Sequence, residues 1–293
     1  PVKLALDAVL AIDHHRTMPK YAGQKFETWY KREAAKQQQQ FANKVSYFHG
    51  CYVNYNNPQL GRDFVTVLNA LGYGVELLEK ERCCGVAKIA NGLIDQARKD
   101  AKHNLGSIRR AVKEQGQKVV ATSSTCCFTI RDEYHHLLGL ENSDVRSDIE
   151  LATRFVYRLI DEQGLSLRFK PDFKLRVAYH SACHLERMGW TIYSTSLLRM
   201  IPGVEWLPLE SQCCGIAGTY GFKRENYKYS QAIGKSLFER IESLKPDVVS
   251  TDCETCKWQI EMSTSVKVEH PISILARAID VEATMKANGV QLK

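Results

Sequence analysis

Two cysteine doublets, each followed by glycine, are the residues of this sequence best suited to chemistry. The first is Cys83-Cys84-Gly85, and Cys213-Cys214-Gly215 follows 130 positions later. Neighbouring thiols make a poor disulfide framework, because bond geometry disfavours closing so small a ring. A chain of 293 residues can also bury a core without cross-links. The doublets therefore predict thiolate ligands for a metal, in a reducing compartment.

The remaining cysteines recur at nearly the same interval. Cys51 precedes Cys183 by 132 residues, and Cys126 precedes Cys256 by 130. The ten cysteines thus divide into two sets of five. The first set is Cys51, Cys83, Cys84, Cys126 and Cys127, and the second set is Cys183, Cys213, Cys214, Cys253 and Cys256. This division predicts two metal sites made by one duplicated unit.

The two sets are not equal. When the doublets are aligned, Ser123 stands where the second set has Cys253. The extra thiol of the first set is Cys127, directly beside Cys126. We therefore expect a complete site in the second set. The first set has four well-placed cysteines, with Cys127 an uncertain ligand, and is expected to hold a different cluster, a labile one or none.

Five convergent thiolates favour an iron–sulfur centre. A structural zinc site is closed by four ligands, whereas iron–sulfur clusters contain several irons held by several thiolates. Zinc, and thiol redox chemistry without metal, remain alternatives. Gly85 and Gly215 fit the same hypothesis, because a residue without a side chain lets the backbone approach a bulky cluster.

Three histidines lie beside the first cysteine of a set. His49 and His180 precede Cys51 and Cys183, and His184 follows Cys183. A histidine there can be a ligand or a proton carrier. The commoner role is that of a histidine hydrogen-bonded at a strand end.

Apolar runs alternate with helical patterns along the chain. Strands are expected at 45–48, 75–78, 118–122, 175–179, 204–209 and 247–251, and helices at 59–71, 94–115, 226–243 and 272–287. Ser147 and Glu150 form a capping box that predicts a helix starting there, with Ile149 on its apolar face. Alternating strands and helices predict an α/β fold with parallel sheets. Each cysteine group then falls at the carboxyl end of a strand, where such sheets bind ligands.

Residues 1–44 differ from the two cysteine-rich units, expected at 45–168 and 169–293. They hold no cysteine and many basic residues, with Phe26, Trp29 and Tyr30 among them. We expect a helical arm packed on the body; the alternative is a docking segment for a membrane or for a partner protein.

Composition and missing motifs exclude several classes of function. No apolar run approaches the length of a transmembrane helix. The net charge of +7 permits an anionic partner, but nucleic-acid-binding motifs are absent, so no nucleic acid is expected. No acid/base pair, catalytic triad, Walker loop or dinucleotide fingerprint is evident. The sequence thus favours electron transfer, and it names no catalytic residue.

Four stretches carry a resemblance to a known family. They are YFHGCYVNYNNPQLG at 47–61, TSSTCCFTIRDEY at 122–134, SQCCGIAGTYGF at 211–222 and TDCETCKWQIEMSTS at 251–265. They resemble the CCG domain of the heterodisulfide reductase B subunits and of the iron–sulfur subunits of glycolate and lactate oxidases. Within that group the chain is most similar to the C subunits of anaerobic glycerol-3-phosphate dehydrogenases, over roughly residues 15–285.

The resemblance implies a cofactor and a ligand set. In the B subunits of heterodisulfide reductases, each five-cysteine set binds a non-cubane 4Fe–4S cluster. By position, Cys183, Cys213, Cys214, Cys253 and Cys256 match such a set in full, and Cys51, Cys83, Cys84 and Cys126 match it in part. The dehydrogenase C subunits also carry an N-terminal ferredoxin-like domain, which this sequence lacks, so residues 1–44 would be a linker from it.

The resemblance also implies a function. Electrons would pass from partner subunits that carry FAD to the membrane quinone pool, and glycerol 3-phosphate would be oxidised on the flavin-bearing partner. The chain would lie peripherally on the cytoplasmic face of the inner membrane. The alternatives are disulfide reduction on a cluster, as in heterodisulfide reductase, and a zinc-stabilised scaffold that anchors the flavin subunits.

Overall fold

Two parallel β-sheets with the same strand order form the framework of the protein. The computed structural model describes residues 2–291, without the side chains of Val2, Ala5 and Leu6. The first sheet has the order β2-β1-β3-β4 and contains β1 (Asn43–Phe48), β2 (Tyr73–Leu77), β3 (Lys118–Ala121) and β4 (Ile149–Leu151). The second has the order β6-β5-β7-β8 and contains β5 (Leu175–Tyr179), β6 (Val204–Leu207), β7 (Val248–Ser250) and β8 (Val268–Glu269). The predicted α/β fold of two repeated units is thereby confirmed.

The central strands are buried on both faces, which explains their apolar sequences. Residues 45–48 of β1 and 119–121 of β3 are buried, as are residues 177–179 of β5. The pairing is parallel throughout, with Val45 beside Val75 in the first sheet and Val177 beside Trp206 in the second. The carboxyl ends of neighbouring strands therefore lie at the same edge of each sheet.

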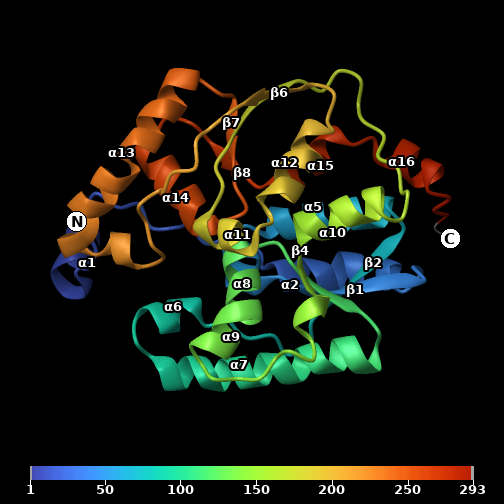
Figure 1. Cartoon of the computed structure of the whole chain (residues 1–293), viewed down its shortest axis with the longest axis horizontal. Coiled ribbons are helices and arrows are strands. Elements are labelled where there is room, and N and C mark those ends of the chain that lie inside the picture. The colour runs from blue at the N-terminus through green and yellow to red at the C-terminus, as the bar shows by residue number, and fades with distance from the viewer. Residues whose placement is uncertain (1, 292–293) are drawn as a thin grey trace.

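Four helices fill the space between the two sheets (Figure 1). Two come from the first unit, α5 (Pro58–Ala70) and α10 (Ala152–Asp161), and two from the second, α12 (Thr191–Arg199) and α15 (Pro271–Ala278). α5 packs against α15 and α10 packs against α12, so each contact joins the two units. The helices α7 (Ile94–Arg109) and α13 (Tyr227–Leu244) lie on the outer sides.

Short helices follow the carboxyl ends of the strands, and five of the ten cysteines lie in them. They are α4 (Gly50–Tyr55), α6 (Val86–Ala90), α8 (Ser124–Phe128), α11 (Cys183–Met188) and α14 (Glu254–Ser263). α11 of the second unit contacts α8 of the first, near the centre of the molecule (Figure 1). The edges that carry the two cysteine sets therefore face each other.

The N-terminal region contributes aromatic side chains to the core. It contains α1 (Val2–Leu10), α2 (Phe26–Trp29), a π-helical turn (Tyr30–Ala34) and α3 (Ala35–Gln38). Phe26 and Tyr30 are buried, and the Tyr30 hydroxyl donates a hydrogen bond to the Val75 carbonyl over 2.5 Å. Arg62 stacks its guanidinium on the Trp29 ring. These aromatic residues therefore pack on the body of the protein, and the docking of residues 1–44 to a membrane or a partner stays a prediction.

The capping-box prediction at Ser147 is wrong. Ile149–Leu151 is the strand β4, and α10 begins only at Ala152. The buried Glu150 carboxylate accepts hydrogen bonds from Arg154 and Arg158 instead of capping a helix. Pairing with β3 thus overrides the local helical signal.

The last predicted helix is divided in two. α15 ends at Ala278 and α16 (Val281–Ala287) begins after Asp280, whose carboxylate accepts a hydrogen bond from the Ala283 N–H. The remaining elements are the helix α9 (Tyr134–His136) and the short turns Arg110–Glu114, Thr129–Glu133, Arg146–Asp148, Tyr220–Phe222 and Arg224–Asn226.

Candidate metal centres

The five thiols of the second set come from three adjacent strand ends. Cys183 opens α11 after β5, the doublet follows β6, and Cys253 and Cys256 lie at the start of α14 after β7. The sulfur atoms of Cys214 and Cys256 are 3.3 Å apart. Hydrogen bonds between thiols link the five in the order Cys183, Cys213, Cys214, Cys256 and Cys253. The structure thus brings together every residue predicted for this site.

These contacts divide the thiols into donors and acceptors of hydrogen bonds. Hydrogen bonds from Cys183 and Cys214 lower the pKa of Cys213, and the pKa of Cys183 is raised in return. A hydrogen bond from Cys256, with others from Thr125 and Thr255, lowers the pKa of Cys253 to about 5 although burial opposes it. Thiolates so close together repel one another. Several of them would ionise together only around a bound cation, which is the property of a metal site.

The first set repeats this arrangement with four thiols. Hydrogen bonds link Cys51 to Cys83, Cys83 to Cys84 and Cys84 to Cys126. Donation from Cys51 and Cys84 lowers the pKa of Cys83, as it does for Cys213 in the second set. In both sets the N–H group after the doublet points to the first sulfur of the doublet, at 3.5 Å for Gly85 and 3.3 Å for Gly215.

Ser123 occupies the position of the fifth ligand in the first set. It precedes α8 as Cys253 precedes α14. Its hydroxyl donates to the Glu254 carboxylate over 2.8 Å and accepts from the Cys126 N–H over 3.1 Å. The Ser123 side chain is therefore hydrogen-bonded to a residue of the other repeat.

Cys127 lies apart from the other thiols. Its side chain is fully buried in the core, and burial raises its pKa to about 12. Within the described residues, none of the hydrogen bonds that link the other four thiols includes Cys127. Its environment is that of a core residue.

The two glycines after the doublets allow the backbone to adopt a left-handed conformation. Gly85 has φ of +93° and Gly215 has φ of +83°, a region that favours glycine. A Cβ atom on Gly215 would lie 2.1 Å from the Ser230 carbonyl oxygen of α13. The missing side chain of Gly215 therefore makes room for α13, and the approach of its backbone to a cluster stays a prediction.

The three histidines have different surroundings. His49 bonds the Gly50 carbonyl over 3.0 Å and lies 3.3 Å from Glu27 and 3.4 Å from Glu81. His184 bonds the Thr125 hydroxyl over 3.2 Å and stacks on Phe128. Both therefore have the structural role that is common at strand ends. His180 is buried, and burial lowers its pKa to about 4.

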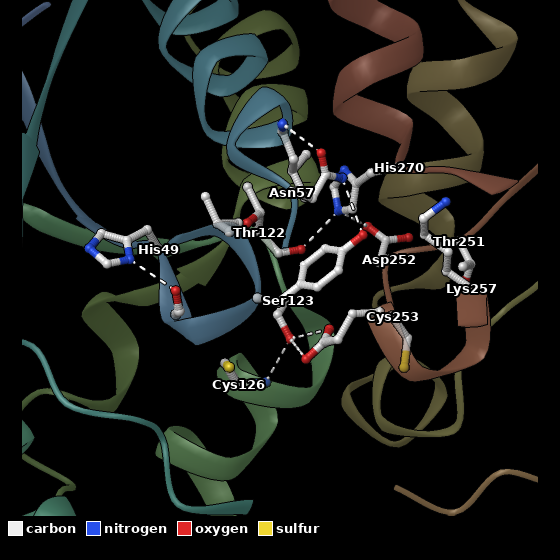
Figure 2. Close-up of a pocket in the computed structure, with 15 residues that line it drawn as sticks. His49, Asn57, Thr122, Ser123, Cys126, Thr251, Asp252, Cys253, Lys257 and His270 are labelled. Atoms are coloured by element: carbon white, nitrogen blue, oxygen red, sulfur yellow. Dashed lines mark hydrogen bonds and ion pairs between the residues drawn. The ribbon is translucent and has the colours of Figure 1, made fainter. Parts of the chain in front are cut away.

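A pocket between the two repeats separates the cysteine sets (Figure 2). Ser123, Cys126 and Cys253 line it, with Glu254 and His270. The Thr125 hydroxyl lies 3.5 Å from the Cys253 sulfur, and His270 bonds the Thr122 carbonyl over 2.8 Å. Burial raises the pKa of Glu254 to about 7. The only signal for Glu254 in the sequence was its place inside Cys-x-x-Cys, and its Ser123 partner lies 131 residues away.

Arg16 is a buried charge near the second set that the sequence did not reveal. It is 2% exposed and donates to the Gly221 carbonyl, to Ser230 and to Gln259. Its guanidinium stacks on Tyr227 at 4.7 Å and lies close enough to Cys214 to interact with it electrostatically. No ion pair joins Arg16 to a carboxylate in the part of the chain that the structure describes.

The second donor set fits a polynuclear centre better than a closed zinc site. Five thiols exceed the four ligands of structural zinc, and all five lie on one continuous hydrogen-bonded path. Both sets are partly open to solvent at their first cysteines, Cys51 and Cys183. Soft thiolate donors in this number suit iron–sulfur clusters.

Comparison with known proteins agrees with this chemistry. The CCG cysteine-rich domain model matches twice, at residues 45–131 and 177–261. The chain is 59% identical to the C subunit of the anaerobic glycerol-3-phosphate dehydrogenase of Escherichia coli K12, over 95% of this chain and 70% of that protein. It is 28% identical to an uncharacterized iron–sulfur protein of Methanocaldococcus jannaschii, over 80% of this chain and 47% of that one.

A third relative is the B subunit of the CoM/CoB fumarate reductase of Methanothermobacter marburgensis. The identity is 29%, over 75% of this chain and 42% of that protein. The duplicated sheets, the two cysteine sets and these matches lead to one conclusion. The chain belongs to the CCG cysteine-rich domain family and, within it, to the family of anaerobic glycerol-3-phosphate dehydrogenase C subunits.

Proposed function

We propose that this chain carries electrons through two iron–sulfur centres, from flavin-bearing subunits of a glycerol-3-phosphate dehydrogenase to the membrane quinone pool. The observation that carries the proposal is the convergence of two thiol sets at the facing edges of two parallel sheets. The relatives named as part of a dehydrogenase and as an iron–sulfur protein support it.

Each centre has a proposed set of ligands. Cys183, Cys213, Cys214, Cys253 and Cys256 would hold a 4Fe–4S cluster, for which a non-cubane form suits five thiolates. Cys51, Cys83, Cys84 and Cys126 would hold the other centre with one thiolate fewer. When bound, the clusters supply reversible one-electron chemistry, and the protein supplies their ligands, burial and hydrogen bonds.

The contacts between the repeats offer a short route between the centres. Ser123 beside the first set bonds Glu254 beside the second, and Thr125 approaches the Cys253 sulfur. Asp252 accepts hydrogen bonds from Thr153 of the first unit and from Tyr179 of the second, which fixes the two edges together. Rigid, buried contacts of this kind keep two redox centres at a constant separation.

The proposed location of the chain is the cytoplasmic face of the inner membrane, to which it would bind peripherally. Among residues 2–291, no helix combines the length and the apolar composition needed to cross a bilayer. In this proposal partner subunits attach the chain, and the quinone meets it at the membrane surface.

The proposal is tested by assembling the chain with its flavin-bearing partner subunits. Glycerol 3-phosphate should then reduce a soluble quinone analogue, and Cys214→Ser should abolish this transfer while substrate-dependent flavin reduction persists. Cys127→Ala is the matched control, because that buried thiol lies outside the hydrogen-bonded set, and it should retain the transfer. Unchanged quinone reduction in Cys214→Ser would contradict the proposed electron path.

A further inference from the structure

His180 has the most unusual hydrogen-bonding state of any histidine near the cysteine sets. It is 1% exposed and follows directly after β5. Both ring nitrogens are buried, and neither has a hydrogen-bond partner among the described residues. A buried polar group without a partner destabilises the folded state. Such a group in a native fold therefore points to a missing ligand or ion.

Two thiols of the second set lie close to the unpaired His180 imidazole. A His180 ring nitrogen and the sulfurs of Cys214 and Cys256 all lie within 4.8 Å of one another, and all three residues are buried. Ligand atoms of one metal lie about 2.0–2.3 Å from it. Three donors this close together can share one metal atom, although the imidazole forms no hydrogen bond with either thiol.

The first repeat supplies an internal comparison. His49 follows β1 as His180 follows β5, but its imidazole lies between Glu27 and Glu81 and bonds the Gly50 carbonyl. Glu81 stands two residues before the first doublet, and the corresponding residue of the second repeat is Ser211. The Ser211 hydroxyl donates instead to Glu186 over 2.6 Å. His180 is thus left without the carboxylate that binds His49.

We propose that His180 is a nitrogen ligand of the second metal centre, beside Cys214 and Cys256, and that the first centre has no histidine ligand. This inference rests on the proposed function, because it needs a metal centre in the second set. A neutral imidazole adds no negative charge to the centre, whereas each thiolate does. Histidine ligation is associated with higher reduction potentials in iron–sulfur proteins, so loss of the nitrogen ligand should change the potential of the second centre only.

The test is pulsed electron paramagnetic resonance on the whole chain, loaded with iron and sulfide without air and labelled with ¹⁵N-histidine. The signal that Cys214→Ser removes should show the strong nuclear coupling of a directly bound nitrogen. His180→Ala should lose that coupling and shift the potential of this signal, while His49→Ala should keep both. Absence of the coupling in the native chain, or its persistence in His180→Ala, would overturn the proposal.

A second measurement separates failure of this inference from failure of the proposed function. If the native chain takes up no iron and sulfide, the proposed function fails, and Co²⁺ then serves as the probe for the ligand set. His180→Ala should weaken Co²⁺ binding to the second set by roughly tenfold or more, and His180→Leu should do the same with an unchanged circular dichroism spectrum. Equal Co²⁺ affinity in the native chain and in both variants would refute His180 as a ligand.

Discussion

At the scale of single residues, one position distinguishes the two centres. Cys253 and Ser123 lie at equivalent places before α14 and α8. Cys253 joins the thiol set of its own repeat, whereas the Ser123 hydroxyl donates to Glu254 of the other repeat. A hydroxyl is a harder and less acidic donor than a thiol, so it is a poorer ligand for iron. The two centres should therefore differ in ligand number and in spectrum.

Replacing this serine tests the difference directly. Ser123→Cys should give the first set a fifth thiol and move its electron paramagnetic resonance spectrum towards that of the second centre. Ser124→Cys is the matched control, because the Ser124 hydroxyl points to the Asp252 carbonyl. It should leave both spectra unchanged. Equal spectra for Ser123→Cys and the native chain would show that position 123 does not set the identity of the first centre.

At the scale of elements, the second doublet is held against the backbone of α13. The Cβ position of Gly215 lies 2.1 Å from the Ser230 carbonyl oxygen, and that of Gly85 has Ala97 Cβ as its nearest atom, at 3.6 Å. Both glycines have positive φ, so both disfavour alanine for conformational reasons. Only at Gly215 would a side chain also clash with the backbone of a neighbouring helix.

Alanine substitutions separate these two effects. Gly85→Ala should lower the unfolding free energy by about 1–2 kcal/mol, the cost of the left-handed backbone. Gly215→Ala should lower it by about 3 kcal/mol or more, because overpacking against α13 adds to that cost. Thermal unfolding of the two metal-free variants measures the difference. Equal losses would mean that α13 moves away freely, and the packing argument would fail.

The N-terminal arm is fastened to the second repeat by Arg16. Its guanidinium donates three hydrogen bonds, to Gly221, Ser230 and Gln259, in a buried position. Arg16→Met should destabilise the protein by roughly 2–3 kcal/mol, since hydrogen bonds to charged groups are worth about 1.5–3 kcal/mol and their partners become unpaired. Arg224→Met removes the ion pair between the exposed Arg224 guanidinium and Asp7, and should change stability by much less than Arg16→Met does.

Proteolysis adds a local measurement of the same contact. Trypsin should cleave the arm faster in Arg16→Met than in Arg224→Met or in the native chain. If both variants resist trypsin and unfold like the native chain, Arg16 does not fasten the arm.

The elements were predictable where they have strong local patterns. The strand at 175–179 and the helix near 226–243 agree with β5 and α13 to within one residue. The strands β4 and β8 contain only three and two residues, and they exist because they pair with β3 and β7. So short a segment has no periodicity of its own, and Ile149 instead fitted the apolar face of a helix.

The thiol sets were predictable for a different reason. Chain duplication and the rule that ligands bind at the carboxyl ends of strands place the cysteines together before any contact is known. The partners of those thiols were not predictable, because Arg16 and Glu254 reach the sites from distant segments. Whether the His180 imidazole has a hydrogen-bond partner depends on whether a carboxylate lies beside it. The position of such a carboxylate is decided only in the folded repeat.

At the scale of the molecule, the two repeats pack as two similar protomers would. The helix pairs α5 with α15 and α10 with α12 join the units on one side of the sheets, and α8 with α11 joins them at the cysteine edge. The two thiol sets therefore belong to one packed framework, although each is built by one repeat. This arrangement predicts that each centre assembles by itself and that electrons exchange between them.

Metal and spectroscopic analysis of protein prepared without air tests the central claim most directly. The native chain should contain iron and acid-labile sulfide in similar amounts, and it should show two titratable paramagnetic signals. Cys84→Ser should remove one signal and Cys214→Ser the other, while Cys127→Ala should keep both. Stoichiometric zinc without sulfide, and no paramagnetic signal at any potential, would contradict the account.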